Sequence, residues 1–186
     1  MRRPGGIHSQ LGTATTSCIL RFVPDPASTS RTLPSGVVTF MLTDIVGSTQ
    51  LKGLVPGVTS GQRDRYYREN IKAPHDAIIA ACREARGGHI VNPTGDGFLL
   101  AFADAEEAVL CALEIQEKLT AAAIPTPEGP LAARIGLHSG QATPEAGDYA
   151  ASAADKCARM QSKALGGQVF LSAETLLLVR GKIRGV

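Results

Sequence analysis

The stretch VVTFMLTDIVGST, residues 37–49, decides how the rest of the chain is interpreted. Its first seven residues are mostly apolar or β-branched, which predicts a central strand that is buried on both faces. Asp44 follows this strand, and the turn after Asp44 is small and rich in backbone N–H groups. Such a turn can hold phosphate oxygens, so Gly47, Ser48 and Thr49 are candidate phosphate-binding residues.

A second aspartate, Asp96, occupies a turn in NPTGDGF (92–98), directly before the apolar run FLLAF (98–102). If two strands of one sheet bring these turns together, the carboxylates of Asp44 and Asp96 repel each other unless a cation lies between them. Neither turn contains a basic side chain, and oxygen ligands favour a hard cation. The pair therefore predicts a Mg²⁺ or Mn²⁺ site for a nucleoside triphosphate. Taken alone, either aspartate is equally typical of a simple turn.

Length and composition set limits on the protein class. The 186 residues suffice for one domain with a core, and 44% hydrophobic and 19% charged residues are typical of a soluble globular protein. Nineteen basic and 17 acidic residues give a net charge of +2, which argues against nucleic acid, an anionic membrane and a polymerase-like palm domain. No apolar run is long enough to span a membrane.

Four widely spaced cysteines without a CxxC pair argue against a zinc site and favour a reducing cytoplasm. Cys82 and Cys111 are expected to be buried thiols.

The order of expected elements indicates an α+β fold. Residues 1–36, which contain one short apolar run at 18–23, are expected to form a flexible leader. Strands are expected at 37–43, 89–92, 98–102, 132–140 and 168–172, helices at 63–86, 104–123, 152–163 and from 172 on, and loops at 53–61 and 125–130. Asp104 is expected to begin its helix in a capping box with Glu107. The first six elements follow the ferredoxin-like βαββαβ plan, an antiparallel sheet with helices on one face, which brings Asp44 near Asp96.

Four blocks in this order resemble the class III nucleotidyl cyclase catalytic domain, especially small bacterial adenylate/guanylate cyclases. They are FMLTDIVGSTQL (40–51), GGHIVNPTGDGFLLAF (87–102), RIGLHSG (134–140) and GGQVFLS (166–172). The resemblance covers residues 37–180 and implies a cyclase domain over residues 37–186. The family's terminal hairpin, with a lysine that touches the triphosphate, is expected to be missing, and neither Lys182 nor Arg184 can be assigned to that role.

This resemblance implies an activity. The family converts a nucleoside triphosphate to a 3′,5′-cyclic monophosphate and pyrophosphate by in-line phosphoryl transfer with two metal ions. Asp44 and Asp96 would hold the two Mg²⁺ or Mn²⁺ ions, together with the carbonyl of Ile45. One ion would activate the ribose 3′-hydroxyl and the other would neutralise the triphosphate. Family members work as head-to-tail dimers with the site at the interface, so a homodimer is expected.

Three further residues acquire roles through the resemblance. Arg134 matches an arginine that contacts phosphates, although it could also be a solvated charge at a strand edge. Asp148 matches the residue that reads the adenine amino group. A carboxylate accepts from that amino group and repels the O6 atom of guanine, so ATP is expected and GTP is less favoured, although Asp148 could equally belong to a simple Gly-Asp turn. Arg159 matches the arginine that stabilises the transition state.

Two residues depart from the family pattern. Asn92 stands where the family has a purine-reading lysine or glutamate, and an amide can both donate and accept. Asp155 stands where the family has an asparagine that stabilises the reacting ribose-phosphate. An ionised carboxylate cannot donate there, and two like charges at 4 Å cost about 4 kcal/mol at an effective dielectric of 20. Asp155 could instead occupy the first turn of its helix and pair with Arg159 four residues on.

The sequence therefore predicts a weakly active adenylate cyclase domain. The alternative is a catalytically degenerate module that binds nucleotide or dimerises and regulates a partner protein. His75 and His138 invite catalytic roles, but each is expected to be structural, since His75 lies on an apolar helix stripe and His138 lies within a strand.

Overall fold

The computed structural model describes residues 32–149 and 151–183. Most of the expected leader, including the apolar run at 18–23, and Arg184 lie outside the described residues. The described elements follow one another in this order: β1 (Gly36–Ile45), α1 (Ser48–Leu54), α2 (Ser60–Tyr67), the π-helix η2 (Arg68–Lys72), α3 (Ala73–Ala85), β2 (His89–Thr94), β3 (Gly97–Phe102), α4 (Ala105–Ala122), β4 (Pro125–Thr126), β5 (Gly129–Pro130), β6 (Ala133–Ala142), α5 (Ala151–Lys163), β7 (Val169–Leu171) and α6 (Ala173–Val179).

A five-stranded sheet organises the domain, with the strand order β2-β3-β1-β6-β7. The expected central strand, β1, pairs antiparallel with both β3 and β6. This order confirms the α+β, ferredoxin-like arrangement. The sheet is mixed, however, because β7 pairs parallel to β6. Helix α5 connects these two strands, as a parallel crossover requires.

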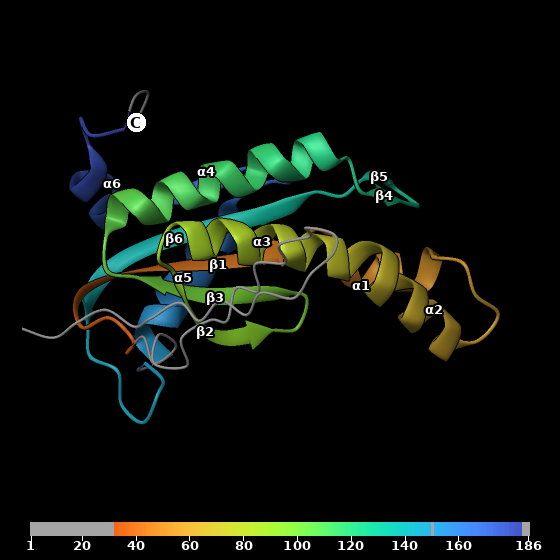
Figure 1. Ribbon diagram of the computed structural model, residues 1–186, viewed down its shortest axis with the longest axis horizontal. Coiled ribbons are helices and arrows are strands. Elements are labelled where there is room, and N and C mark those ends of the chain that lie inside the picture. Colours follow the sequence, from red (N-terminus) through yellow and green to blue (C-terminus); the bar gives the residue numbers. More distant parts are fainter. Residues whose placement is uncertain (1–31, 150, 184–186) are drawn as a thin grey trace, which may run out of the picture. The chain divides into compact units, whose positions relative to one another are not determined.

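Helices lie on both faces of the sheet (Figure 1). Neighbouring side chains along β1 belong to two separate buried clusters. Met41 and Leu100 are buried against the core that α3 and α4 contribute, which includes the buried thiols Cys82 and Cys111. The expected packing of the first two helices on one face is therefore confirmed. Phe40, next to Met41, belongs to a second cluster on the opposite face, which α5 covers.

Helix α5 lies in direct contact with strand β6. A Cβ atom added at Gly136 would lie 2.1 Å from the backbone nitrogen of Gln161 on α5. The Cys157 Sγ atom donates to the carbonyl oxygens of Phe40, at 3.4 Å, and Gly136, at 3.2 Å. Because the two backbones meet at Gly136, the position of α5 on the sheet depends on the lack of a side chain there.

Several local expectations need correction. Residues 48–54 form α1, a helix that was not expected, and its last two residues fall in the segment expected to be a loop. The expected helix at 63–86 is interrupted by the π-helix η2. Residues 125–130 form a short hairpin, β4–β5. Asp104 caps α4 by accepting from the Glu106 N–H at 2.8 Å, but the capping box with Glu107 is wrong, because the Glu107 carboxylate accepts from Arg86.

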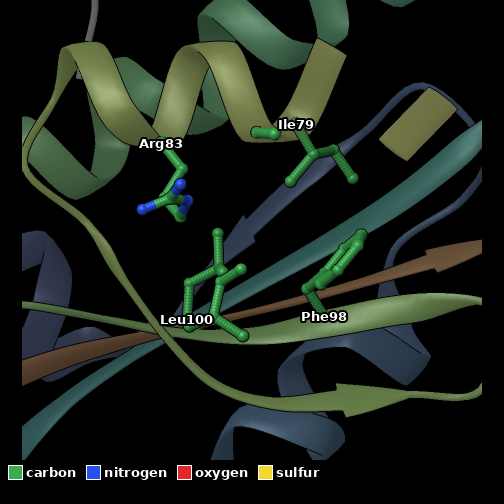
Figure 2. Close-up of a pocket in the computed structure, with 6 residues that line it drawn as sticks. Ile79, Arg83, Phe98 and Leu100 are labelled. Carbon is green, nitrogen blue, oxygen red and sulfur yellow. The ribbon is translucent and has the colours of Figure 1, made fainter. Parts of the chain in front are cut away.

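A small pocket lies between α3 and β3 and is lined by Ile79, Arg83, Phe98 and Leu100, among others (Figure 2). Its volume of about 10 Å³ is at the lower limit for one water molecule. The pocket is therefore too small to be the nucleotide site. Within the described ranges, none of the helices combines the length and apolar character needed to cross a membrane.

Replacing Gly136 with alanine tests the contact between α5 and β6. The added methyl group has no room against the Gln161 backbone, so we expect the free energy of unfolding to fall by about 1–3 kcal/mol in urea titrations. Gly61→Ala is the matched control, because Gly61 lies on α2 with nothing within 4 Å of an added Cβ. Equal stability of the two variants would contradict this packing.

Candidate active site

The end of β1 opens into a cleft of about 450 Å³. Asp44 and Ile45 form one side of it, and Arg134 on the neighbouring strand β6 completes the lining. The expected phosphate-binding turn, Gly47 to Thr49, lines the same cleft together with Gln50. The structure thus brings together the first aspartate, the small turn and the arginine assigned to phosphate.

The turn at Gly47 has free donors and one acidic neighbour. Gly47 adopts a left-handed conformation, φ 66°, and its carbonyl accepts from the Leu51 N–H at 2.9 Å to start α1. The N–H groups of the first turn of α1 precede that bond and have no acceptor within the helix. Glu128, from the β4–β5 hairpin, borders the turn and accepts from the Gln50 side chain at 2.6 Å. A phosphate bound here would meet donors and one carboxylate.

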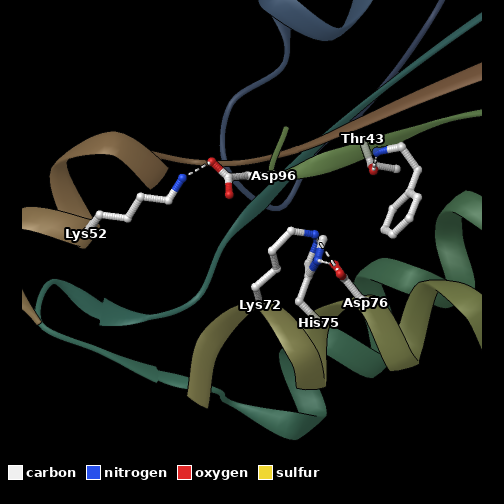
Figure 3. A network of polar contacts seen from close by, with 7 residues as sticks. Thr43, Lys52, Lys72, His75, Asp76 and Asp96 are labelled. Atoms are coloured by element: carbon white, nitrogen blue, oxygen red, sulfur yellow. Dashed lines mark hydrogen bonds and ion pairs between the residues drawn. The ribbon is translucent and has the colours of Figure 1, made fainter. Parts of the chain in front are cut away.

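The second aspartate reaches the same corner of the sheet because Gly97 follows it. A Cβ atom on Gly97 would lie 1.8 Å from the Thr43 carbonyl oxygen and 3.2 Å from the Asp44 Cα. The Phe98 N–H also donates to the Thr43 hydroxyl at 3.0 Å (Figure 3). This close approach of β3 to β1 puts Asp96 and Asp44 at one end of the sheet.

Each of the two carboxylates has a cationic partner from outside its own turn. Lys52, on α1, donates to Asp96 Oδ2 at 2.8 Å (Figure 3). Arg134 lies directly opposite Asp44 in the β1–β6 register and forms an ion pair with it. Gln161 Nε2 lies 3.4 Å from the same Asp44 oxygen. Neither turn contains a basic residue, so both partners come from other segments of the chain.

Lys52 is the site residue that the sequence reasoning missed. It lies in α1, which was not expected to be a helix, and its partner Asp96 is remote in sequence. The only sequence signal for Lys52 is its spacing, because it lies four residues, about one helical turn, after Ser48. Arg134, by contrast, was assigned to the site in advance, although to phosphate rather than to Asp44.

The pairing with Lys52 affects ionisation. Burial by itself raises the pKa of Asp96, but hydrogen bonds from Lys52 and Ser48 outweigh burial and leave that pKa below its usual value. Asp96 is therefore an anion at neutral pH. Under the ammonium lies the ring of Tyr67, whose centroid is 4.9 Å from Lys52 Nζ. Burial and the charge of Asp96 raise the pKa of the Tyr67 hydroxyl, so this tyrosine stays neutral.

A separate polar cluster next to the site consists of Lys72, His75 and Asp76. Lys72 donates to one oxygen of Asp76 at 2.6 Å, and His75 Nδ1 lies 2.9 Å from the other (Figure 3). The His75 side chain is fully buried. His75 therefore occupies a structural position in the core, as expected, and Lys72 is already committed to Asp76.

The donor set fits a metal–nucleotide complex. Within residues 32–149 and 151–183, no group of three or more His, Cys, Asp or Glu side chains could hold a metal ion. Mg²⁺ commonly binds one or two carboxylates and takes its remaining ligands from water and substrate phosphates. Asp44 and Asp96 suit that pattern, and the guanidinium and ammonium groups beside them show that this corner attracts positive charge.

The two residues expected to read the purine lie together. Asn92, on β2, donates its side-chain N–H to Asp148 Oδ2 at 3.1 Å, and both side chains are exposed. The other Asp148 oxygen accepts from the Tyr149 N–H at 2.7 Å. These two bonds hold the Asp148 carboxylate in place. The amide oxygen of Asn92 takes no part in the bond between Asn92 and Asp148.

Helix α5 places Asp155 and Arg159 on an exposed face, and neither lines the Asp44 cleft of its own chain. Among the described residues, no ion pair joins Asp155 to Arg159, so that expectation is wrong. The first turn of α5 contains no acidic residue, because the helix starts at Ala151. The proposed first-turn role of Asp155 is therefore also wrong.

His138 is buried, as expected for a structural histidine, with 4% of its surface exposed. Its Nδ1 atom lies 3.1 Å from the Ser172 hydroxyl, which caps α6. Burial lowers the pKa of His138, against the opposing effect of the Glu174 carboxylate. The side chain belongs to a buried polar cluster, away from the Asp44 cleft.

Comparisons with known proteins connect this geometry to nucleotidyl cyclases. No protein-family model matches the chain. An uncharacterized protein of Mycobacterium tuberculosis is 33% identical over 158 residues, which are 83% of this chain and 49% of the relative. An adenylate cyclase of Lachancea kluyveri is 30% identical over 165 residues, 76% of this chain and 8% of that protein. The chain thus spans about half the length of the mycobacterial relative.

Two solved structures share most of the fold. One is the catalytic core of a rhodopsin-guanylyl cyclase with converted specificity in complex with ATPalphaS, with a TM-score of 0.68, 23% identity, and coverage of 80% of this chain and 83% of that one. The other is an adenylate/guanylate cyclase/hydrolase from Silicibacter pomeroyi, with a TM-score of 0.61, 25% identity, and coverage of 80% and 82%.

Titration of His138 tests its buried position. The pKa in the folded state lies below the unfolded value of 6.5, so the unfolded state binds more protons. The stability that depends on neutral His138 is complete above pH 6.5 and is lost as the pH falls through the folded-state pKa. Urea titrations from about pH 8 to about pH 5 should show a smaller loss for His138→Gln than for the natural chain. An NMR titration midpoint above 6.5 for His138 would contradict this environment.

Proposed function

We propose that this chain, which has the fold of the class III nucleotidyl cyclase catalytic domain, converts ATP to 3′,5′-cyclic AMP and pyrophosphate. We assign the domain to residues 37–186. The observation that carries the proposal is one cleft lined by Asp44, a donor-rich turn and Arg134, with Asp96 at the same corner of the sheet.

Asp44 and Asp96, with the carbonyl of Ile45, are the residues that would hold Mg²⁺ or Mn²⁺. Divalent ions bound there would neutralise the triphosphate and make the ribose 3′-hydroxyl more acidic. The same two carboxylates would also position the nucleotide, because they determine where the ions that neutralise the triphosphate lie. One oxygen of each carboxylate already forms an ion pair in the structure, which supports a role for both side chains in binding a cation.

The triphosphate is bound by the chain's own donors. N–H groups of Ser48 and Thr49 lie in the first turn of α1, where no helical acceptor competes for them. Arg134 uses one terminal nitrogen on Asp44, and its guanidinium has further N–H groups to give to a phosphate oxygen. Glu128 opposes anion binding at the rim, so the arginine and the metal charge are both needed.

The base preference follows from the hydrogen bond between Asn92 and Asp148. Because the Asn92 N–H is given to Asp148, the pair offers a ligand mainly acceptor oxygens. Acceptors suit the exocyclic amino group of adenine and are unfavourable to the O6 atom of guanine. ATP is therefore the preferred substrate and GTP a poorer one.

The active unit is a head-to-tail homodimer. Arg159 and Asp155 are absent from the lining of their own chain's cleft, so a second copy must supply them if they touch the substrate. Three described cysteines are free thiols, which supports a reducing, cytoplasmic location.

A second function, nucleotide binding without turnover in the regulation of a partner protein, has one specific observation in its favour. Asp155 is exposed on α5 without an ion-pair partner among the described residues, and its charge would oppose a triphosphate. Nucleotide binding by calorimetry, with no cyclic product over long incubation, would favour this function over catalysis.

An assay of cyclic AMP formation from ATP with Mn²⁺ tests the enzyme proposal. We expect measurable product from the natural chain and a loss of about 100-fold or more for Asp44→Asn and for Asp96→Asn, because each removes a charge on which the reacting phosphates depend. Asp64→Asn, on the exposed surface of α2, is the matched control and should keep full activity. Full activity without both aspartates would refute the assigned site.

Asp155→Asn tests the departure from the family pattern. The variant removes a like charge from the vicinity of the triphosphate and restores a side-chain donor, so we expect the rate to rise by about tenfold or more. Asp64→Asn again controls for the loss of one surface carboxylate. A rate that is unchanged or lower would show that Asp155 is not the reason for weak turnover.

A further inference from the structure

We propose that Lys52 is a built-in competitor for the divalent cation at Asp96, and that its ammonium group leaves the carboxylate when metal binds. This inference rests on the proposed metal site and adds a residue that regulates access to it. Lys52 lies on α1, whose first turn is the phosphate-binding turn, so the same short helix contributes the anion donors and the competing cation.

The ammonium group is held from two sides. Its Nζ atom is 2.8 Å from Asp96 Oδ2, a contact drawn in Figure 3. The same atom is 4.9 Å from the centroid of the Tyr67 ring. Tyr67 is almost fully buried, so the ring is a fixed surface. An ammonium over an aromatic face is attracted by the ring's negative potential. These two contacts keep a positive charge on Asp96 in the absence of metal.

The exposure of the two partners favours competition over a permanent structural pair. The Asp96 side chain is 13% exposed and is the buried partner, whereas the Lys52 side chain is 37% exposed. The lysine can therefore return to solvent at low cost, while Asp96 cannot remain without a counter-charge. A cation that replaces the ammonium satisfies that need.

Simultaneous occupation of Asp96 by Lys52 and a divalent ion is unfavourable. Both would lie within about 4 Å of each other on one carboxylate, and two positive charges at that distance repel strongly. Metal ions also require direct contact with carboxylate oxygens, one of which Lys52 now uses. Binding of free metal therefore includes the work of displacing the lysine.

The other nearby cations are less suited to this role. Lys72 donates to Asp76 at 2.6 Å and packs over the Phe98 ring at 5.3 Å. Arg134 lies in a cross-strand pair with Asp44, and its Nε atom is buried. The side chains of Lys52 and Arg134 are similarly exposed, at 37% and 33%, but Lys52 is the partner of the more buried carboxylate, since Asp96 is 13% exposed and Asp44 is 31% exposed.

Binding of Mn²⁺ alone, measured by electron paramagnetic resonance without nucleotide on the full chain, tests the inference. We expect Lys52→Gln to bind Mn²⁺ about two- to fivefold more tightly than the natural chain, since a partly exposed ion pair changes affinity by up to about that factor. Lys118→Gln is the matched control. Lys118 donates to Glu114 at the same distance of 2.8 Å on α4, outside the cleft, and its loss should leave Mn²⁺ affinity unchanged.

A second variant controls for the loss of packing between the Lys52 side chain and Tyr67. Lys52→Met keeps an unbranched apolar stem beside Tyr67 and should tighten Mn²⁺ binding as Lys52→Gln does. Asp96→Asn in the Lys52→Gln background should abolish the gain, which assigns the added affinity to the Asp96 carboxylate.

The outcomes separate this inference from the proposed function. If Mn²⁺ binding depends on Asp44 and Asp96 but both Lys52 variants bind no more tightly than the natural chain, the competitor role is overturned and the metal site stands. If no form of the chain binds Mn²⁺, including both Lys52 variants, the metal site and the competitor role are overturned together.

Discussion

The close approach of β3 to β1 at Gly97 is the constraint on which the candidate site depends. No side chain fits between Gly97 and the Thr43 carbonyl, so the hairpin turn that carries Asp96 lies directly against the end of β1. Asp44 is the next residue along β1. A glycine contact in the sheet thus brings the two acidic residues to the same end of the sheet, where each carboxylate has a cationic partner.

The negative charge of each aspartate is compensated by a cationic side chain. Arg134 reaches Asp44 because the antiparallel register sets the two residues opposite each other. Lys52 reaches Asp96 because α1 starts immediately after the Gly47 turn. The two cations come from different elements, one on a strand of the sheet and the other on a short helix. Each aspartate therefore has one positive partner, and the partner of Asp96 is the one that we propose to exchange for a metal ion.

The candidate residues lie in two regions of the chain, and this division is the basis of the homodimer that we propose. Asp44 and the turn of Gly47 to Thr49, the candidate phosphate-binding turn, share one cleft, whereas Asn92 and Asp148 form a hydrogen-bonded pair and Arg159 lies exposed on α5. Because α5 packs on Gly136, Arg159 lies on the sheet face opposite α3 and α4. Symmetric pairing of two copies is the simplest way to bring such separated groups to one substrate.

The sequence alone determined most of the strands and helices, the caps of α4 and α6 and the buried thiols, because hydrophobic periodicity and capping residues are local signals. The strand order around β1 followed from the βαββαβ order of these elements. The pairing of Asp44 with Asp96 at a metal site stays a prediction. Only the tertiary structure decided that Lys52 and Arg134 neutralise the two aspartates, that Asn92 donates to Asp148, and that Asp155 does not pair with Arg159. Those contacts join residues far apart in sequence or depend on side-chain direction. No local pattern encodes either, because both are set by how elements pack in space.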